Sequence, residues 1–223
     1  FMQIVWGLRK EPFIGVRPLN HAKEAPTTGA WQFTNAIDSW SWQGYEGEKA
    51  VVEVYANSAS VRLLLNGKEI ANKPVKKYKT LFKLPYQPGT LTAEALDERG
   101  NVISSHSLTT AGEETVLRVT PDKMVLCANN QSLCYLPIEF TDKAGNLKPY
   151  MEQLVEVAVA GAATLAGFGS ALCKTNEVFD KPYHHSYRGR CLAVLRAGST
   201  PGKAKVTVTS AGMEPVTIEV EVQ

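Results

Sequence analysis

The sequence lacks long hydrophobic runs, a strong excess of one charge and long stretches of helical periodicity. No segment approaches the roughly 18 consecutive apolar residues of a transmembrane helix, so we expect no membrane span. The 24 basic and 22 acidic residues nearly balance, which gives a formal net charge of +2. Proteins that bind nucleic acid usually concentrate basic residues on one face, and we therefore expect no nucleic-acid partner.

The densest group of basic residues lies between Lys73 and Lys79. Lysines often protect the edge strand of a sheet against pairing with another chain. We therefore interpret this group as a solvated strand edge and not as a phosphate-binding surface.

Cysteines are few, and their spacing excludes the common cysteine motifs. The chain has four cysteines: Cys127, Cys134, Cys173 and Cys191. None forms the C-x-x-C pair of zinc ribbons and redox sites, and free thiols and a disulfide both stay open. His184 and His185 adjoin one another in the sequence, and two adjacent side chains on a strand would point to opposite faces. They are therefore poorly placed to bind a metal with Cys191, and we expect neither a metal ion nor a cofactor.

Alternation of apolar and polar residues is the dominant pattern. In the last segment Val216, Ile218, Val220 and Val222 alternate with polar residues, which predicts a strand with one buried and one solvated face. Comparable patterns mark residues 52–54, 61–65, 155–159 and 204–209. Short strands separated by turn signals predict antiparallel sandwiches. The strongest turn signal is Asn66-Gly67, because both residue types tolerate the positive φ of a type I′ hairpin.

We therefore predict an all-β chain with two tandem antiparallel β-sandwich domains of the immunoglobulin-like or fibronectin-like type. A strand pattern ends near residue 110, a small polar stretch follows, and a new strand begins at Thr115. This places the sandwiches at residues 30–112 and 113–223, each near the ~100 residues of an immunoglobulin-like domain. Residues 1–29 are predicted to be a lead-in segment. Because Phe1 is not a natural initiator, we expect them to follow a longer polypeptide.

The sequence contains no convincing catalytic constellation. Neighbouring carboxylates occur only in turn-like segments, as at Glu46 and Glu48 or Glu113 and Glu114, and we interpret them as solvated surface. There is no G-x-S-x-G nucleophile elbow and no phosphate-binding glycine loop. We therefore predict no catalytic residue in this chain.

Aromatic residues provide the strongest candidate for binding. They form one cluster: Trp31, Phe33, Trp40, Trp42 and Tyr45. Exposed aromatic rings can stack on sugars, whereas buried ones contribute about 150–250 Å² each to a core or interface. We favour core packing or docking for the cluster, with a sugar-binding rim at Trp40, Trp42 and Tyr45 as the alternative. A second stretch, from Tyr183 to Tyr187, is interpreted as a sandwich loop.

Several stretches resemble the region that follows the catalytic barrel in glycoside hydrolase family 2 enzymes of the β-galactosidase type. The more specific ones are SWSWQGYEG at 39–47, VYAN at 54–57, VRLLLNGK at 61–68 and PYQPGTL at 85–91. Looser likenesses to the terminal sandwich of these enzymes occur at 165–170 and 188–196. Residues 4–7 are similar to the end of the last barrel helix. The resemblance therefore extends over nearly the whole chain.

The resemblance implies a non-catalytic accessory region of a larger retaining glycosidase. Retaining hydrolysis uses two carboxylates about 5–5.5 Å apart, which in this family lie on a (β/α)₈ barrel of at least about 200 residues. The alternating strands and helices of a barrel are missing here. We expect the isolated chain to be inactive and its partner to be the barrel of the same polypeptide, which the sandwiches brace and whose substrate entrance they shape.

The resemblance further implies a periplasmic or secreted parent that hydrolyses terminal β-galactosides. Two other functions stay open from the residues alone. These are a stand-alone carbohydrate-binding module, with carbohydrate as partner, and an immunoglobulin-like cell-surface adhesion protein. The run of motifs at 39–91 favours the glycosidase.

Overall fold

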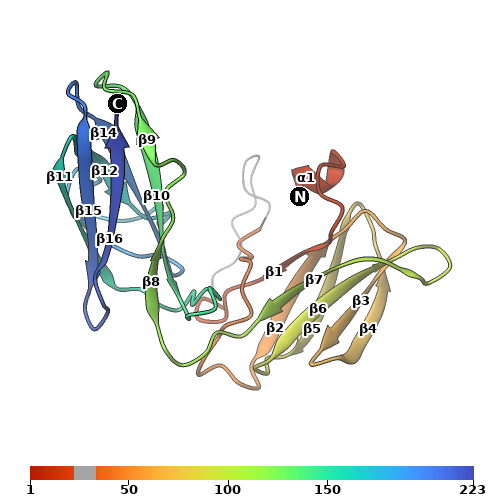
Figure 1. Ribbon diagram of the computed structural model, residues 1–223. Helices are drawn as coiled ribbons and strands as arrows, with labels where there is room; N and C mark the ends of the chain where they lie inside the picture. Colours follow the sequence, from red (N-terminus) through yellow and green to blue (C-terminus); the bar gives the residue numbers. More distant parts are fainter. Residues whose placement is uncertain (23–33) are drawn as a thin grey trace. The chain divides into compact units, whose positions relative to one another are not determined.

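The computed structural model describes residues 1–22 and 34–223, and the all-β prediction is confirmed (Figure 1). Among these residues the single α-helix is α1, Met2–Val5, and no helix is long and apolar enough to cross a membrane. The chain divides into two compact units, Phe1–Ala111 and Gly112–Gln223. Trp31 and Phe33 of the aromatic cluster lie outside the described residues.

The first unit contains two antiparallel sheets. Its strands are β1 Phe13–Val16, β2 Lys49–Tyr55, β3 Ser60–Leu65, β4 Lys68–Pro74, β5 Lys79–Pro85, β6 Thr90–Leu96 and β7 Val102–Thr109. The sheet orders are β1-β2-β5 and β4-β3-β6-β7. Alternate residues of both sheets are buried in one hydrophobic core, to which β2 contributes Val52 and Val54 and β3 contributes Val61 and Leu63.

Part of the predicted lead-in segment belongs to this first sandwich. Residues Phe13–Val16 form β1 and pair antiparallel with β2, and Ile14 and Val16 are fully buried in the core. A four-residue strand that includes Gly15 is too short to show a clear alternation in the sequence. Its conformation depends on the partner strand β2, which lies more than 30 residues further along the chain.

The hairpin between β3 and β4 has the predicted type I′ geometry. Asn66 and Gly67 have φ values of 52° and 77°, as both central residues of this turn require. The Asn66 side chain also accepts a hydrogen bond from the Thr90 backbone N–H at 2.8 Å. A Cβ atom at Gly89 would overlap the Asn66 amide, so the neighbouring turn depends on glycine at that position.

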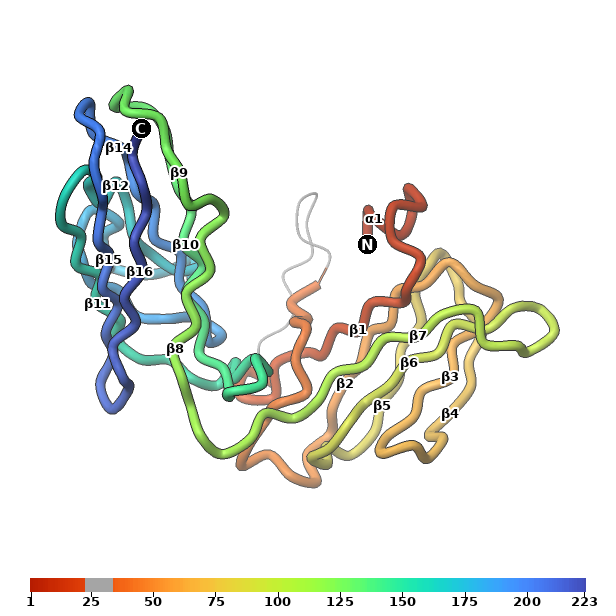
Figure 2. The backbone as a smooth tube through the Cα atoms, viewed as in Figure 1, coloured from red at the N-terminus to blue at the C-terminus, as the bar shows by residue number. Residues whose placement is uncertain are grey.

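The second unit is also built from two sheets. Its strands are β8 Val116–Val119, β9 Val125–Leu126, β10 Leu133–Thr141, β11 Leu154–Gly161, β12 Ala163–Gly169, β13 Tyr183–His185, β14 Arg190–Ala197, β15 Gly202–Ser210 and β16 Val216–Val222. The sheet orders are β12-β14-β10-β8 and β13-β11-β15-β16-β9. Only the short strand β9 is parallel to its neighbour, and it lies beside β16 at one sheet edge (Figure 2).

All four cysteines lie among the described residues and are free thiols. Cys134 and Cys191 belong to the core of the second unit, whereas Cys127 and Cys173 are exposed. Burial raises the pKa of the Cys191 thiol to about 12, so this residue behaves as a small apolar side chain.

The segment interpreted as a loop after residue 182 forms a strand. Tyr183–His185 is β13, an edge strand that pairs with Leu154–Glu156 of β11. Three residues cannot establish a periodicity in the sequence, and the neighbouring strand β11 imposes the extended conformation. The lysine group was interpreted correctly as a strand edge, because Lys73 lies on β4 at the edge of its sheet.

The turn between β4 and β5 offers a test of backbone strain. Lys77 and Tyr78 have φ values of 50° and 62°, and a left-handed conformation costs a non-glycine residue about 1–2 kcal/mol. We predict that Lys77→Gly raises the free energy of unfolding by about 0.5 kcal/mol, because relief of this strain exceeds the entropy that glycine adds to the unfolded chain, about 0.4–1 kcal/mol. Chemical denaturation measures the change. Lys76→Gly, at a position without positive φ, is the matched control and should destabilise, so equal effects would contradict the prediction.

Candidate functional site

Trp40 and Trp42 are core residues of the first unit. Both side chains have an exposed fraction of 0%. The Trp40 ring packs edge-on against Tyr86 with ring centroids 5.0 Å apart, and its Nε1 donates to the Gln87 carbonyl at 2.9 Å. A ring without exposed surface cannot stack on a sugar. The sugar-stacking alternative is therefore wrong for these two tryptophans.

Hydrogen bonds fix the backbone around the two tryptophans. The Trp42 backbone N–H donates to the Tyr86 hydroxyl at 3.0 Å, and the Thr110 hydroxyl donates to the Trp40 carbonyl at 2.7 Å. The Ala111 N–H donates to the Ser41 hydroxyl at 2.9 Å. The SWSW segment thus ties the β5–β6 connection to the end of β7.

Tyr45 differs from the tryptophans because it is only partly buried. It packs against the core of the first unit and also lines an open cavity of about 760 Å³, which we call the Tyr45 cavity. This volume lies within the ~300–1,000 Å³ of typical small-molecule sites. Charged residues of both signs share the lining: Arg17, Glu48, Lys49 and Lys83. The cavity is suited to a polar ligand, and Tyr45 is the one predicted site residue that a ligand can reach.

A buried carboxylate lies behind the wall of this cavity. Glu53 on β2 is 0% exposed and accepts from Arg17 Nε at 2.8 Å, from Lys79 Nζ at 2.6 Å and from the Tyr55 hydroxyl at 2.6 Å. Burial raises the pKa of Glu53, but the hydrogen bonds from Lys79, Tyr55 and Arg17 together hold the pKa below its usual value. Glu53 is therefore ionised and fully engaged, which suits a structural role and not proton transfer.

The neighbouring carboxylates singled out in the sequence lie at the surface, as predicted. Glu46, Glu48, Glu113 and Glu114 are exposed. Asp97 begins the β6–β7 turn, where its carboxylate accepts from the backbone N–H groups of Arg99 and Asn101. None of these groups has the buried, paired environment of a glycosidase acid and nucleophile.

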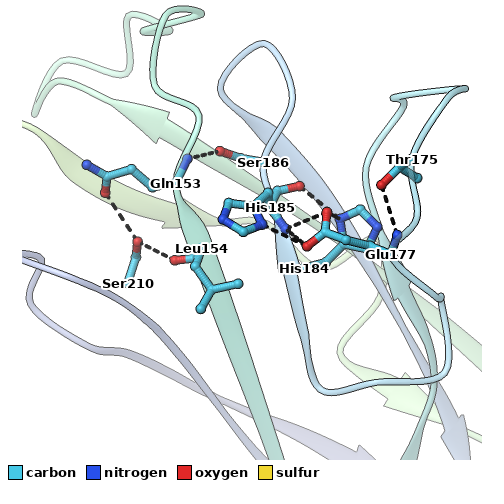
Figure 3. A network of polar contacts seen from close by, with 8 residues as sticks. All are labelled: Gln153, Leu154, Thr175, Glu177, His184, His185, Ser186 and Ser210. Atoms are coloured by element: carbon cyan, nitrogen blue, oxygen red, sulfur yellow. Dashed lines mark hydrogen bonds and ion pairs between the residues drawn. The ribbon is translucent and has the colours of Figure 1, made fainter.

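A polar network fixes the edge strand β13 in the second unit (Figure 3). The Glu177 carboxylate lies between the imidazoles of His184 and His185, with Glu177–Nδ1 distances of 3.3 Å and 2.7 Å. It also accepts from the His185 backbone N–H at 3.1 Å. Burial raises the pKa of Glu177, but hydrogen bonds from the His185 side chain and backbone outweigh burial and lower it.

The two histidines point to opposite faces of β13, as predicted, since His184 is buried and His185 exposed. Both nevertheless reach Glu177, because β13 is an edge strand and the carboxylate lies beyond the edge, where either face has access. The His184 ring stacks on Phe179 at 5.6 Å. No group of three or more metal-ligating side chains occurs among residues 1–22 and 34–223. Through its contacts with the His185 backbone and with both imidazoles, Glu177 positions β13.

The hydrogen bonds of Glu53 to Arg17, Lys79 and Tyr55 should make the stability of the first unit depend on pH. We predict that Glu53→Gln lowers the free energy of unfolding at pH 7 by about 2–3 kcal/mol. This is less than the about 3–5 kcal/mol of a fully buried pair, because the Arg17 and Lys79 side chains are 34% and 29% exposed. Since folding lowers the pKa of Glu53, the difference from wild type is full above the ordinary glutamate pKa. It shrinks as the pH falls through the lowered folded pKa.

Denaturant unfolding from pH 7 to pH 3 measures this dependence. Glu48→Gln is the matched control, because Glu48 is exposed and should leave the stability unchanged. A pH-independent difference between Glu53→Gln and wild type would contradict the assignment.

Each of the two units matches a known family model. Residues 117–219 match the family model "Glycoside hydrolase family 2 C-terminal domain 5", and residues 47–104 match a domain of unknown function (DUF4982). A β-galactosidase of Bacteroides ovatus is 30% identical over 195 residues, which cover 86% of this chain and 23% of the relative.

Solved structures agree with these matches. A glycosyl hydrolase family 2 member from Bacteroides cellulosilyticus superposes with a TM-score of 0.86 at 27% identity, covering 100% of this chain and 29% of that one. A second structure from the same species gives a TM-score of 0.84 at 28% identity, over 98% of this chain and 30% of that one. The chain therefore spans less than a third of the length of each of these three relatives. It belongs to glycoside hydrolase family 2, as a C-terminal region of such an enzyme.

Proposed function

We propose that the two sandwiches are non-catalytic and brace the catalytic barrel of the same polypeptide, and that the parent enzyme hydrolyses terminal β-galactosides. The 30% identity to a β-galactosidase over 195 residues carries this proposal. Retaining hydrolysis needs two carboxylates about 5–5.5 Å apart, and no such pair emerged from the carboxylates described above. Because the chain spans 23% of that relative, the parent has room for a barrel elsewhere.

An exposed apolar surface supports docking of the barrel. Around α1 four large apolar side chains face solvent, with exposed fractions of 46% for Phe1, 55% for Met2, 72% for Trp6 and 80% for Leu8. We call this the α1 surface. Contiguous exposed apolar groups commonly mark interaction sites. The buried side chain of Ile4 and an edge-on contact between Phe1 and Tyr55, with ring centroids 5.8 Å apart, hold α1 on the first unit.

The Tyr45 cavity supports a role at the substrate entrance. Among the described residues, its lining combines Tyr45 with charged groups, a chemistry that suits a hydroxyl-rich ligand. In this role the cavity contacts parts of the galactoside that extend beyond the barrel, so carbohydrate is a partner of the assembled enzyme. Family membership favours this role over an adhesion protein. We further propose a periplasmic or secreted location for the parent, which cell fractionation tests.

The docking role predicts a difference between the isolated chain and its parent. The double substitution Trp6→Ser and Leu8→Ser should leave the thermal unfolding midpoint of the isolated chain unchanged, because both side chains are exposed. In the parent the same pair should shorten the half-life of galactosidase activity at elevated temperature several-fold. The isolated chain itself should show no turnover of a chromogenic β-galactoside. Turnover above background, or a parent that is insensitive to the substitutions, would overturn this role.

The entrance role predicts an effect on KM that depends on substrate length. In the parent, Tyr45→Ala should raise KM for galacto-oligosaccharides at least about threefold, the effect of roughly 0.7 kcal/mol of lost contact. It should leave kcat and the hydrolysis of short aryl galactosides unchanged. Tyr78→Ala, which changes a partly buried tyrosine of the β4–β5 turn, is the control. Equal effects on short and long substrates would remove Tyr45 from the entrance.

A further inference from the structure

The outer face of the five-stranded sheet in the second unit carries a hollow of about 290 Å³, which we call the Tyr183 hollow. Its lining comes from three neighbouring strands and the residue that precedes one of them: Glu156, Val157, Ala158, Pro182, Tyr183, Thr207 and Thr209. Alternation places the Glu156, Ala158, Thr207 and Thr209 side chains on the side opposite to Val155, Val157, Val206 and Val208, which are buried in the core. The hollow is therefore a surface feature of the second unit and separate from the Tyr45 cavity.

Strand register assembles the hollow. Glu156 on β11 pairs with Tyr183 on β13 and with Thr209 on β15, so these three side chains form one row across the sheet. In the next row Ala158 pairs with Thr207. Because the Ala158 side chain is only a methyl group, the surface is lower there than at Tyr183 and at the two threonines, and this difference in height forms the hollow.

The polar groups of the upper row are available to a ligand. Within the described part of the chain, the Glu156 carboxylate and the hydroxyls of Tyr183 and Thr209 make no hydrogen bond or ion pair. Another carboxylate of the same sheet behaves differently, since Glu219 pairs with Lys203 at 2.9 Å. The Tyr183 side chain is 48% exposed.

Tyr183 is also held in place before any ligand arrives. Glu177 fixes His185, two residues further along β13, by accepting from its N–H and Nδ1 at 3.1 Å and 2.7 Å. On the other side the Val157 N–H donates to the Pro182 carbonyl at 2.7 Å. The Glu177 network of Figure 3 and the Val157–Pro182 hydrogen bond thus fix the backbone on the two sides of Tyr183, and a pre-organised aromatic group binds with less loss of entropy.

We propose that this hollow binds a neutral pyranose ring of a β-galactoside. The apolar C–H face of the ring stacks on Tyr183, because these hydrogens are attracted to the negative face of the π-system. The ring hydroxyls donate to the Glu156 carboxylate, a charge-assisted hydrogen bond, and exchange hydrogen bonds with Thr209. The carboxylate repels acidic sugars. The choice of galactoside rests on the proposed function, whereas the site itself does not depend on hydrolysis.

The test is a titration of the isolated chain with lactose, followed by the backbone amide shifts in NMR spectra. We expect saturable shifts at β11, β13 and β15 with a Kd on the order of 1 mM, typical of the weak end of specific binding. Tyr183→Ala and Glu156→Gln should each weaken binding at least about tenfold, and Tyr183→Phe, which keeps the ring, should retain most of it. Glucuronic acid should bind far more weakly than lactose.

Tyr135→Ala is the matched control, because Tyr135 is an exposed tyrosine of the same unit on β10, in the other sheet. It should leave lactose binding unchanged. Unperturbed amide shifts elsewhere in each variant show that the fold is intact. The proposal is overturned by absent saturation, by equal losses in Tyr183→Ala and Tyr135→Ala, or by binding that Tyr45→Ala removes. If the proposed binding site is wrong, the parent still hydrolyses galactosides. If the proposed function is wrong, the isolated chain still binds lactose, so the two failures are distinguishable.

Discussion

The packing of Trp40 and Trp42 around Tyr86 holds the first unit together. Both indoles are completely buried, and the Tyr86 hydroxyl accepts from the Trp42 backbone N–H at 3.0 Å. Replacing one such ring by alanine costs about 3–5 kcal/mol, a large part of the about 5–15 kcal/mol that stabilises a domain. Because Thr110 also bonds the Trp40 carbonyl, the end of the unit depends on the same segment. A segment with this role has no aromatic surface left for a ligand.

A shared turn shows how each sandwich is closed by local hydrogen bonds. Asp97–Asn101 and Asp142–Asn146 both read D-x-x-G-N, and in each the aspartate accepts from the backbone N–H of the asparagine at 2.8 Å. In the second unit Asp142 additionally accepts from the Gly112 N–H at 2.9 Å. The buried Lys148 donates to the Glu113 carbonyl at 2.8 Å, and burial lowers its pKa. The beginning of the second unit is thus fixed by groups of that unit.

The sequence alone predicts the features that depend on residues close together in the sequence. The alternation at 216–222 and the Asn66-Gly67 turn are such features, and both agree with the structure. The strands β1 and β13 were missed because each is only three or four residues long and takes its conformation from a distant partner. The sequence also left the burial of the tryptophans open, because it shows an aromatic cluster but not which rings the second sheet covers.

The Tyr183 hollow was beyond sequence reasoning for a related reason. Glu156, Tyr183 and Thr209 lie more than 25 residues apart from one another, and none belongs to a motif. Only the registers of β13 with β11 and of β11 with β15 bring them into one row. A shift of either register by two residues would keep the same faces buried but would separate these three side chains. The pattern of buried residues in the sequence therefore does not reveal that they lie in one row.

Surface chemistry favours different partners for the α1 surface and the Tyr183 hollow. The side chains of the α1 surface are apolar apart from the indole N–H of Trp6, so it has almost nothing to offer sugar hydroxyls, and its burial against protein removes apolar area from water at about 25 cal/mol per Å². The hollow has the opposite balance. A protein partner without a matching donor would have to desolvate the unpaired Glu156 carboxylate, which is costly, whereas a pyranose ring supplies hydroxyl donors and an apolar face together. The unpaired charge that disfavours a protein interface is therefore the feature that favours a sugar.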